Sequence, residues 1–146
     1  MPRYIKNVEQ QRAKSAYKCV EDAITKYGQK SKPLKEYKSY VRSIPMMIKN
    51  NGLSNAFAFV LSKSKDGNAY ALIDAQMREW FKDKDKITTE TSFVQYLITL
   101  ESVEYRRMTV EVFAFFTWLK RFADGLIETE EDNTEQKKEK EIEDAN

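Results

Sequence analysis

The chain has 146 residues, of which 41% are hydrophobic, 25 are Lys or Arg, 23 are Asp or Glu, one is Cys and none is His. This length and apolar content suit one domain with one sizeable core, and the small number of Gly (4) and Pro (3) argues against a turn-rich β fold. Because His is absent and Cys19 stands alone, the sequence excludes an internal disulfide, a zinc finger and His-dependent catalysis.

The first half of the chain predicts two long helices. Residues 5–27 carry apolar side chains at helical spacing, and Gly28 follows where a left-handed C-cap belongs. A second helix is expected over residues 31–52, because a Ser and a nearby Pro open it and Asn-Gly closes it. Pro45 lies inside this pattern and removes one backbone hydrogen bond. We therefore expect a kink or a break near Ser43, or two shorter helices.

Three shorter helices are predicted next. Amphipathic patterns predict a helix over about 53–64 and another over about 69–82, and the charged stretch 82–86 is expected to be a loop. A short fifth helix is expected to begin at Ser92, which fits a capping box with Gln95, although two threonines just before it are alternative N-caps.

The last predicted helix has the clearest pattern. Apolar residues recur at spacings of three and four over residues 105–126, and Asp124-Gly125 is expected to stop the helix. We therefore predict an all-α fold, a compact bundle of about six helices in a domain spanning 1–127. Residues 128–146 form an acidic tail that we expect to be mobile or a solvated extension of the last helix.

Residues that support enzymatic chemistry are scarce. The sequence has no glycine-rich phosphate loop, and its paired carboxylates, such as Glu101 with Glu104, stand beside Lys or Arg in polar contexts. We expect no catalytic residues, no metal and no cofactor. No apolar run approaches the roughly 18 residues needed to cross a bilayer, and the first residues lack the apolar core of a secretory signal. A cytoplasmic protein without a membrane partner is expected.

The charge is distributed unevenly along the chain. Residues 1–65 contain 14 basic and 4 acidic residues, residues 66–127 contain 8 and 10, and residues 128–146 contain 3 and 9. Such asymmetry is typical of a protein that meets a polyanion on one side, and phosphate backbones are the commonest such partner. A merely solubilising Lys- and Glu-rich surface is the alternative interpretation.

The second helix carries the clearest binding pattern. At 100° per residue, four basic side chains fall within a sector of about 60° opposite the apolar face. They are Lys35, Lys38, Arg42 and Lys49. Glu36 is the single acidic residue of this helix, so the basic stripe is predicted to track RNA phosphates, and charge reversal at Arg42 and Lys49 should flatten the salt dependence.

Further basic residues are candidates for the same role. Two pairs on the last helix lie fourteen residues apart and return to nearly the same angular position. They are Arg106 with Arg107 and Lys120 with Arg121. Glu104 and Glu111 can pair locally with the arginines and weaken their availability. Lys63 ends the third helix, where it can bind phosphate or cap the helix dipole.

Most large aromatic residues are predicted to belong to the core, because they fall in helical apolar stripes. They are Phe57, Trp80, Phe115, Phe116, Trp118 and Phe122. This distribution favours contact with the RNA backbone over the reading of particular bases.

Several short motifs, taken together, resemble one known family. They are Ile44-Pro45-Met46-Met47-Ile48, Asn51-Gly52-Leu53, Ala56-Phe57-Ala58-Phe59, Ser62-Lys63 and Trp118-Leu119-Lys120-Arg121-Phe122-Ala123. Over roughly residues 5 to 126, the chain resembles the small α-helical subunit of the type III-B CRISPR RNA-silencing complex, the Cmr complex, which acts in antiviral defence.

The resemblance implies a non-catalytic subunit that stacks in several copies along a filament, beside backbone subunits that hold the guide RNA. Its implied partners are other Cmr subunits, copies of itself and the backbones of guide and target RNA. Lys49, Lys63, Lys120 and Arg121 lie in or beside the matching motifs. The remaining candidates rest on charge geometry alone.

A helical adaptor that binds only proteins remains the alternative function. Stacking itself predicts an exposed apolar surface for a neighbouring copy. The near-continuous apolar pattern of residues 56–61 is our candidate for it.

Overall fold

The computed structural model describes residues 2–81 and 92–128. Within these two stretches the chain forms six α-helices: α1 (Pro2–Tyr27), α2 (Lys32–Asn51), α3 (Leu53–Lys63), α4 (Ala69–Phe81), α5 (Phe93–Leu97) and α6 (Ser102–Leu126). The all-α prediction is confirmed for this part of the chain. None of these helices is long and apolar enough to cross a membrane. The predicted loop 82–86 and the tail from residue 129 lie outside the described residues.

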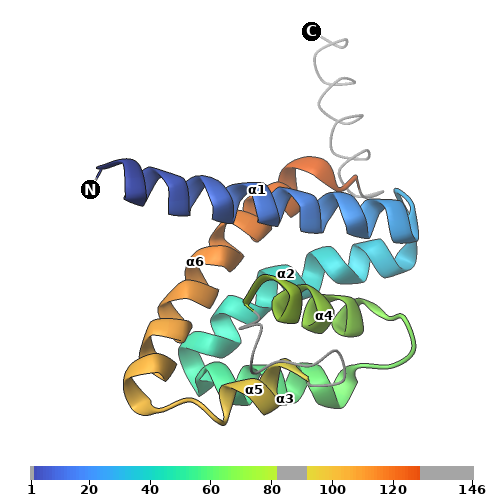
Figure 1. Cartoon of the computed structure of the whole chain (residues 1–146). Coiled ribbons are helices and arrows are strands. Elements are labelled where there is room, and N and C mark those ends of the chain that lie inside the picture. Colours follow the sequence, from blue (N-terminus) through green and yellow to red (C-terminus); the bar gives the residue numbers. More distant parts are fainter. Residues whose placement is uncertain (1, 82–91, 129–146) are drawn as a thin grey trace, which may run out of the picture.

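The two longest helices frame the molecule (Figure 1). α1 lies along one side and packs mainly against α6, which returns from the far end of the bundle next to α5. α2 packs against α6, and α3 and α4 pack against α2. α5 completes the far end through its contacts with α3 and α4.

Buried apolar side chains from all six helices form one core. The stripe predicted on α2 is buried at Tyr37, Val41, Ile44 and Ile48, whereas its fifth member, Tyr40, is only half-buried. Leu34 joins the buried side of the helix. Phe57 lies at the centre of an aromatic cluster and packs edge-on against Phe93, with a centroid separation of 4.8 Å. Among the predicted core aromatics, Phe57, Phe115 and Phe116 are buried. The two tryptophans and Phe122 pack partly buried against them.

α2 is one continuous helix, so a break near Ser43 and the alternative of two shorter helices are wrong, whereas the kink stays a prediction. The helix begins as expected, because the Ser31 Oγ accepts a hydrogen bond from the Leu34 backbone N–H at 3.3 Å. Pro45 removes a single N–H from the ladder, whereas the buried residues on either side of it, Ile44 and Ile48, hold the helix against the core. Core packing therefore outweighs the local effect of the proline.

α6 ends at Leu126, the last residue of the predicted apolar pattern, but Asp124-Gly125 does not stop it, because both residues lie inside the helix. Gln29, in the turn between α1 and α2, forms hydrogen bonds with the backbone groups at this end of α6. Its Nε2 donates to the Leu126 carbonyl and its Oε1 accepts from the Glu128 N–H, both at 2.9 Å. A tertiary contact thus replaces the glycine cap that the local sequence suggested.

The start of α3 is also completed by another helix. Gly52 precedes α3 with φ of +88° and supplies no side-chain cap. The Tyr105 hydroxyl of α6 accepts a hydrogen bond from the Ser54 N–H at 2.9 Å. This contact joins the beginning of α6 to the residues just after α2. α2 and α6 therefore run in antiparallel directions.

A buried polar relay connects three helices. The Tyr37 hydroxyl donates to the Gln76 side-chain oxygen at 2.7 Å, and the Gln76 amide donates to the Cys19 carbonyl at 2.9 Å. Tyr37 is fully buried, so its hydroxyl depends on this partner. The relay fixes α2 and α4 against α1.

Cys19 is expected to resist thiol reagents in the folded protein. Burial raises the pKa of its thiol to about 12, and the nearby Asp22 carboxylate contributes in the same direction. Since the thiolate is the reactive form, alkylation by iodoacetamide should be at least about tenfold slower than at an ordinary cysteine, even though a thiolate of higher pKa is the better nucleophile. Alkylation quenched at successive times and analysed by mass spectrometry, in native buffer and in denaturant, measures the rate for Cys19 in the folded and in the unfolded protein. Equal alkylation rates in the two conditions would contradict the protection of the Cys19 thiol by burial.

Asp74 makes stability depend on pH. Burial raises the pKa of this carboxyl, and the hydrogen bond from the Phe93 N–H (3.3 Å) and the ion pair with Arg78 (3.3 Å) offset only part of the shift. The folded protein thus retains this proton where the unfolded chain has released it. The contribution of Asp74 to stability is full below about pH 4 and is lost as pH rises through the raised pKa.

The Asp74→Asn variant should reveal this dependence, because its amide oxygen can still accept from Phe93 but cannot titrate. We expect its free energy of unfolding to improve relative to the wild type as pH rises from about 4 to about 7. Denaturant titrations at several pH values measure the difference. A difference that is independent of pH would rule out a titrating Asp74 in this range.

Candidate nucleic-acid interface

The structure exposes most of the predicted basic residues. On α2 the exposed members are Lys35, Arg42 and Lys49. The two predicted pairs of α6 and Lys63 at the end of α3 are also exposed. Eight of the nine candidates are therefore accessible to a polyanion.

Lys38 is the exception, and its predicted place on a solvated stripe is wrong. Its side chain is only 8% exposed, and its Nζ donates to the Ile127 carbonyl at 3.4 Å, just beyond the end of α6. An ammonium group is favoured there, because the carboxyl end of a helix carries partial negative charge. Lys38 thus serves to hold α6 against α2.

Arg42 joins the same two helices at the surface. Its Nε lies 3.0 Å from the Asp124 Oδ1, and the two side chains are 57% and 36% exposed. A solvent-exposed pair of this kind contributes only about 0–1 kcal/mol to stability. Its main significance is geometric, because it places the basic stripe of α2 beside the row of α6 that contains Asp124.

That row of α6 carries two more of the predicted cations. Arg106 lies eighteen residues before Asp124, which is a whole number of turns, and Lys120 lies within about 40° of the same row. By helical geometry, Lys35, Arg42 and Lys49 share one side of α2 and Arg106 and Lys120 share one side of α6, and the contact between Arg42 and Asp124 joins the two sides. We call these residues the α2–α6 basic surface: Lys35, Arg42, Lys49, Arg106 and Lys120.

The other two arginines of α6 lie further round the helix. Arg107 and Arg121 are exposed but are rotated by about 60–100° from the Asp124 row. Glu111, expected to pair with the arginines of its own helix, instead binds Arg12 of α1, whose Nε lies 3.1 Å from the carboxylate. This long-range pair fastens α1 to α6.

Lys63 lies apart from the α2–α6 basic surface. Its ammonium is 5.9 Å from the centroid of the Phe59 ring on α3. Phe59 meets Tyr70 of α4 edge-on at 5.9 Å, and Tyr70 stacks on Tyr40 of α2 with centroids 3.7 Å apart. A row of partly exposed rings therefore runs from Lys63 to α2.

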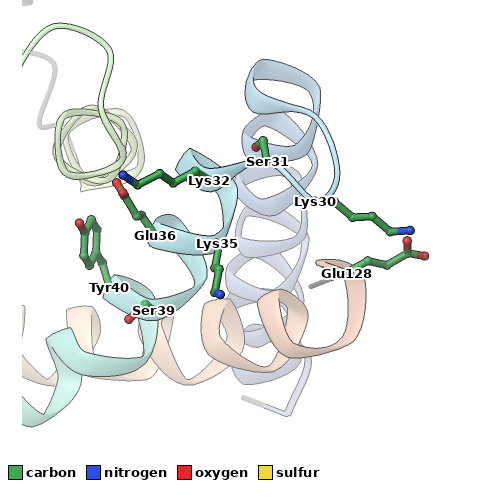
Figure 2. Close-up of a pocket in the computed structure, with 8 residues that line it drawn as sticks. All are labelled: Lys30, Ser31, Lys32, Lys35, Glu36, Ser39, Tyr40 and Glu128. Atoms are coloured by element: carbon green, nitrogen blue, oxygen red, sulfur yellow. The ribbon is translucent and has the colours of Figure 1, made fainter. Parts of the chain in front are cut away.

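Tyr40 borders a surface depression of about 570 Å³ beside the first turns of α2 (Figure 2). Sequence reasoning missed this feature, because it treated Tyr40 only as part of an apolar face. The depression is lined by Lys30, Ser31, Lys32, Lys35, Glu36, Ser39, Tyr40 and Glu128. The spacing of Lys and Tyr in the segment 30–40 was the signal that could have indicated it.

The predicted self-association surface on α3 is only partly available. Ala56, Phe57 and Val60 are buried, whereas Ala58, Phe59 and Leu61 are exposed. Larger exposed fractions occur elsewhere, at Ile98 after α5 and at Val103 and Val110 on α6, each near 70%. Self-association through residues 56–61 stays a prediction.

Comparisons with known proteins agree on one family. Residues 8–126 match the family model described as CRISPR-associated protein (Cas_Cmr5). A relative from Thermus thermophilus, named CRISPR system Cmr subunit Cmr5, is 30% identical over 116 residues, which cover 80% of this chain and 92% of the relative.

A solved structure shows the same fold. The crystal structure of a CRISPR-associated Cmr5 family protein from Thermus thermophilus matches with a TM-score of 0.64 and 30% sequence identity. The match covers 83% of this chain and 97% of the other. The order and packing of helices described above are therefore shared with an experimentally determined structure.

Proposed function

Because this chain belongs to the CRISPR-associated Cmr5 family, we propose that it is the small, non-catalytic subunit of a type III-B Cmr effector complex. In that complex it contacts the backbone of guide or target RNA through the α2–α6 basic surface. The observation that carries this proposal is the contact between Arg42 and Asp124, which joins the basic side of α2 to the side of α6 that contains Asp124.

The charge arrangement supports a backbone contact. The α2–α6 basic surface contains five cations, and the carboxylate of Asp124 within it is already engaged by Arg42. Each phosphate that such a surface neutralises releases counterions, so the affinity should fall steeply with salt and depend little on sequence. Lys38 contributes indirectly by holding α6 in place.

Assembly with other subunits needs a second kind of surface. Ile98, Val103 and Val110 are exposed apolar side chains at the α5–α6 end of the molecule. Apolar groups of this kind favour contact with protein rather than with RNA. We propose that they contribute to packing against copies of the chain or other Cmr subunits in the filament.

Capture from the native cell tests the proposal. The tagged protein is recovered, its bound RNA is sequenced and its bound proteins are identified, with a salt wash series. CRISPR RNA together with larger Cmr subunits, and RNA loss at high salt, is the expected result. Recovery of protein partners without RNA at any salt concentration would instead support the adaptor function.

A further inference from the structure

The depression beside α2 has the size and lining of a binding site. Its volume of about 570 Å³ lies within the range of about 300–1,000 Å³ that is usual for small-molecule sites. Figure 2 shows Tyr40 and Glu36 on one side of it, with Lys32 nearby, and Lys30 with Glu128 on the other. An aromatic face and several ammonium groups thus share one open site.

The ring of Tyr40 is held in a fixed orientation. One face is covered by Tyr70, whose ring lies 3.7 Å away at an interplanar angle of 14°, and Tyr70 in turn rests edge-on against Phe59. Burial raises the pKa of Tyr40, and the nearby Glu36 carboxylate raises it further, so its hydroxyl stays protonated. Tyr40 also lines the depression, so a ligand there can reach the part of the ring that Tyr70 leaves uncovered.

The charges around the depression favour an anion. Three lysines line it against two carboxylates. Glu36 faces the Tyr40 hydroxyl, and Glu128 lies at the far side near Lys30. Figure 2 places Lys32 near Tyr40 and Lys30 on the opposite side of the depression, so of these two lysines Lys32 is the one near the ring.

We propose that this depression binds one unpaired nucleotide of single-stranded RNA. The base stacks on the face of Tyr40 that Tyr70 does not cover, and a neighbouring phosphate meets Lys32. The inference rests on the proposed RNA contact but adds a stacking site beside the first turns of α2, next to Lys35 of the α2–α6 basic surface. Stacking tolerates any base, because every base has a π-face, so the site needs no sequence preference.

Binding of two labelled oligonucleotides to the full chain tests this proposal by fluorescence anisotropy. One is oligoadenylate of about ten nucleotides and the other is an abasic strand with the same ribose-phosphate backbone. Tyr40→Leu removes the aromatic face and keeps an apolar side chain against Tyr70, whereas Tyr40→Phe is the matched control. Lys32→Gln is a second variant that requires no repacking, because Lys32 is exposed.

We expect Tyr40→Leu to weaken oligoadenylate binding about tenfold and to leave abasic binding unchanged, with Tyr40→Phe close to wild type. Lys32→Gln should weaken both strands and lower the salt slope by about one. Equal losses on both strands for Tyr40→Leu, or no loss on either, would overturn the stacking site and leave the backbone contact intact. Absence of binding to both strands by the wild type at low salt would refute the proposed function as well.

Discussion

Simultaneous charge reversal of Lys49, Arg106 and Lys120 is expected to weaken binding of single-stranded RNA on the order of a hundredfold at about 0.1 M salt. All three residues are exposed members of the α2–α6 basic surface. The slope of log affinity against log salt should fall by about two, because each neutralised phosphate of a single strand contributes about 0.7. Anisotropy titrations over a salt series measure both quantities.

A matched triple variant separates position from net charge. Lys14, Lys18 and Lys26 are exposed lysines of α1, and none of them belongs to the α2–α6 basic surface. Reversal of these three to Glu changes the net charge by the same amount and should weaken RNA binding far less. If both triple variants lose affinity equally, the protein attracts RNA only through its overall charge.

Replacement of Phe57 by Ala is expected to lower the free energy of unfolding by about 3–5 kcal/mol. Phe57 is fully buried and joins α3 to two other helices, with ring centroids 4.8 Å from Phe93 and 6.2 Å from Phe116. Truncation therefore removes buried area and leaves a cavity that the surrounding helices cannot fill. Chemical denaturation monitored by circular dichroism measures the loss.

Phe113→Ala is the matched control for this prediction. The same side chain is removed, but Phe113 is 42% exposed on the outer side of α6. We expect a loss below about 1 kcal/mol, because a surface position loses little buried area. A similar loss in both variants would show that the centre of the core does not lie at Phe57.

Local sequence patterns predicted the helices well. The apolar stripes of α2 and α6, the Ser31 cap and the Ser92 cap are all determined by residues within a few positions of one another. Such features depend on helical spacing alone, which the sequence displays directly. The helix ends were less predictable, because Gln29, almost a hundred residues away in sequence, completes the end of α6.

Predictions about the α2–α6 basic surface were limited in the same way, because they also depend on contacts between residues far apart in the sequence. The angular position of Lys38 on α2 was estimated from spacing, but spacing does not reveal that the end of α6 covers that edge. Glu111 similarly has arginines within its own helix, yet Arg12 of α1 binds it. The contacts of both residues are determined by packing between helices far apart in the chain.

The aromatic site was the least accessible to sequence reasoning. Tyr40 and Tyr70 stand thirty residues apart on helices whose mutual packing is a tertiary property. In the sequence, each of these two tyrosines occupies an ordinary apolar position of its own helix. Only their stacking against each other reveals a platform, and only the depression beside Tyr40 shows where a ligand can reach it.

The pairing of the first helix with the last also affects how fast the molecule folds. α1 packs mainly against α6, and its contacts include the ion pair between Arg12 and Glu111. α1 precedes its principal partner by most of the described chain, and Arg12 and Glu111 are 99 residues apart. Closure of the bundle therefore needs a long-range contact, and folds that depend on such contacts fold more slowly than folds built from local ones.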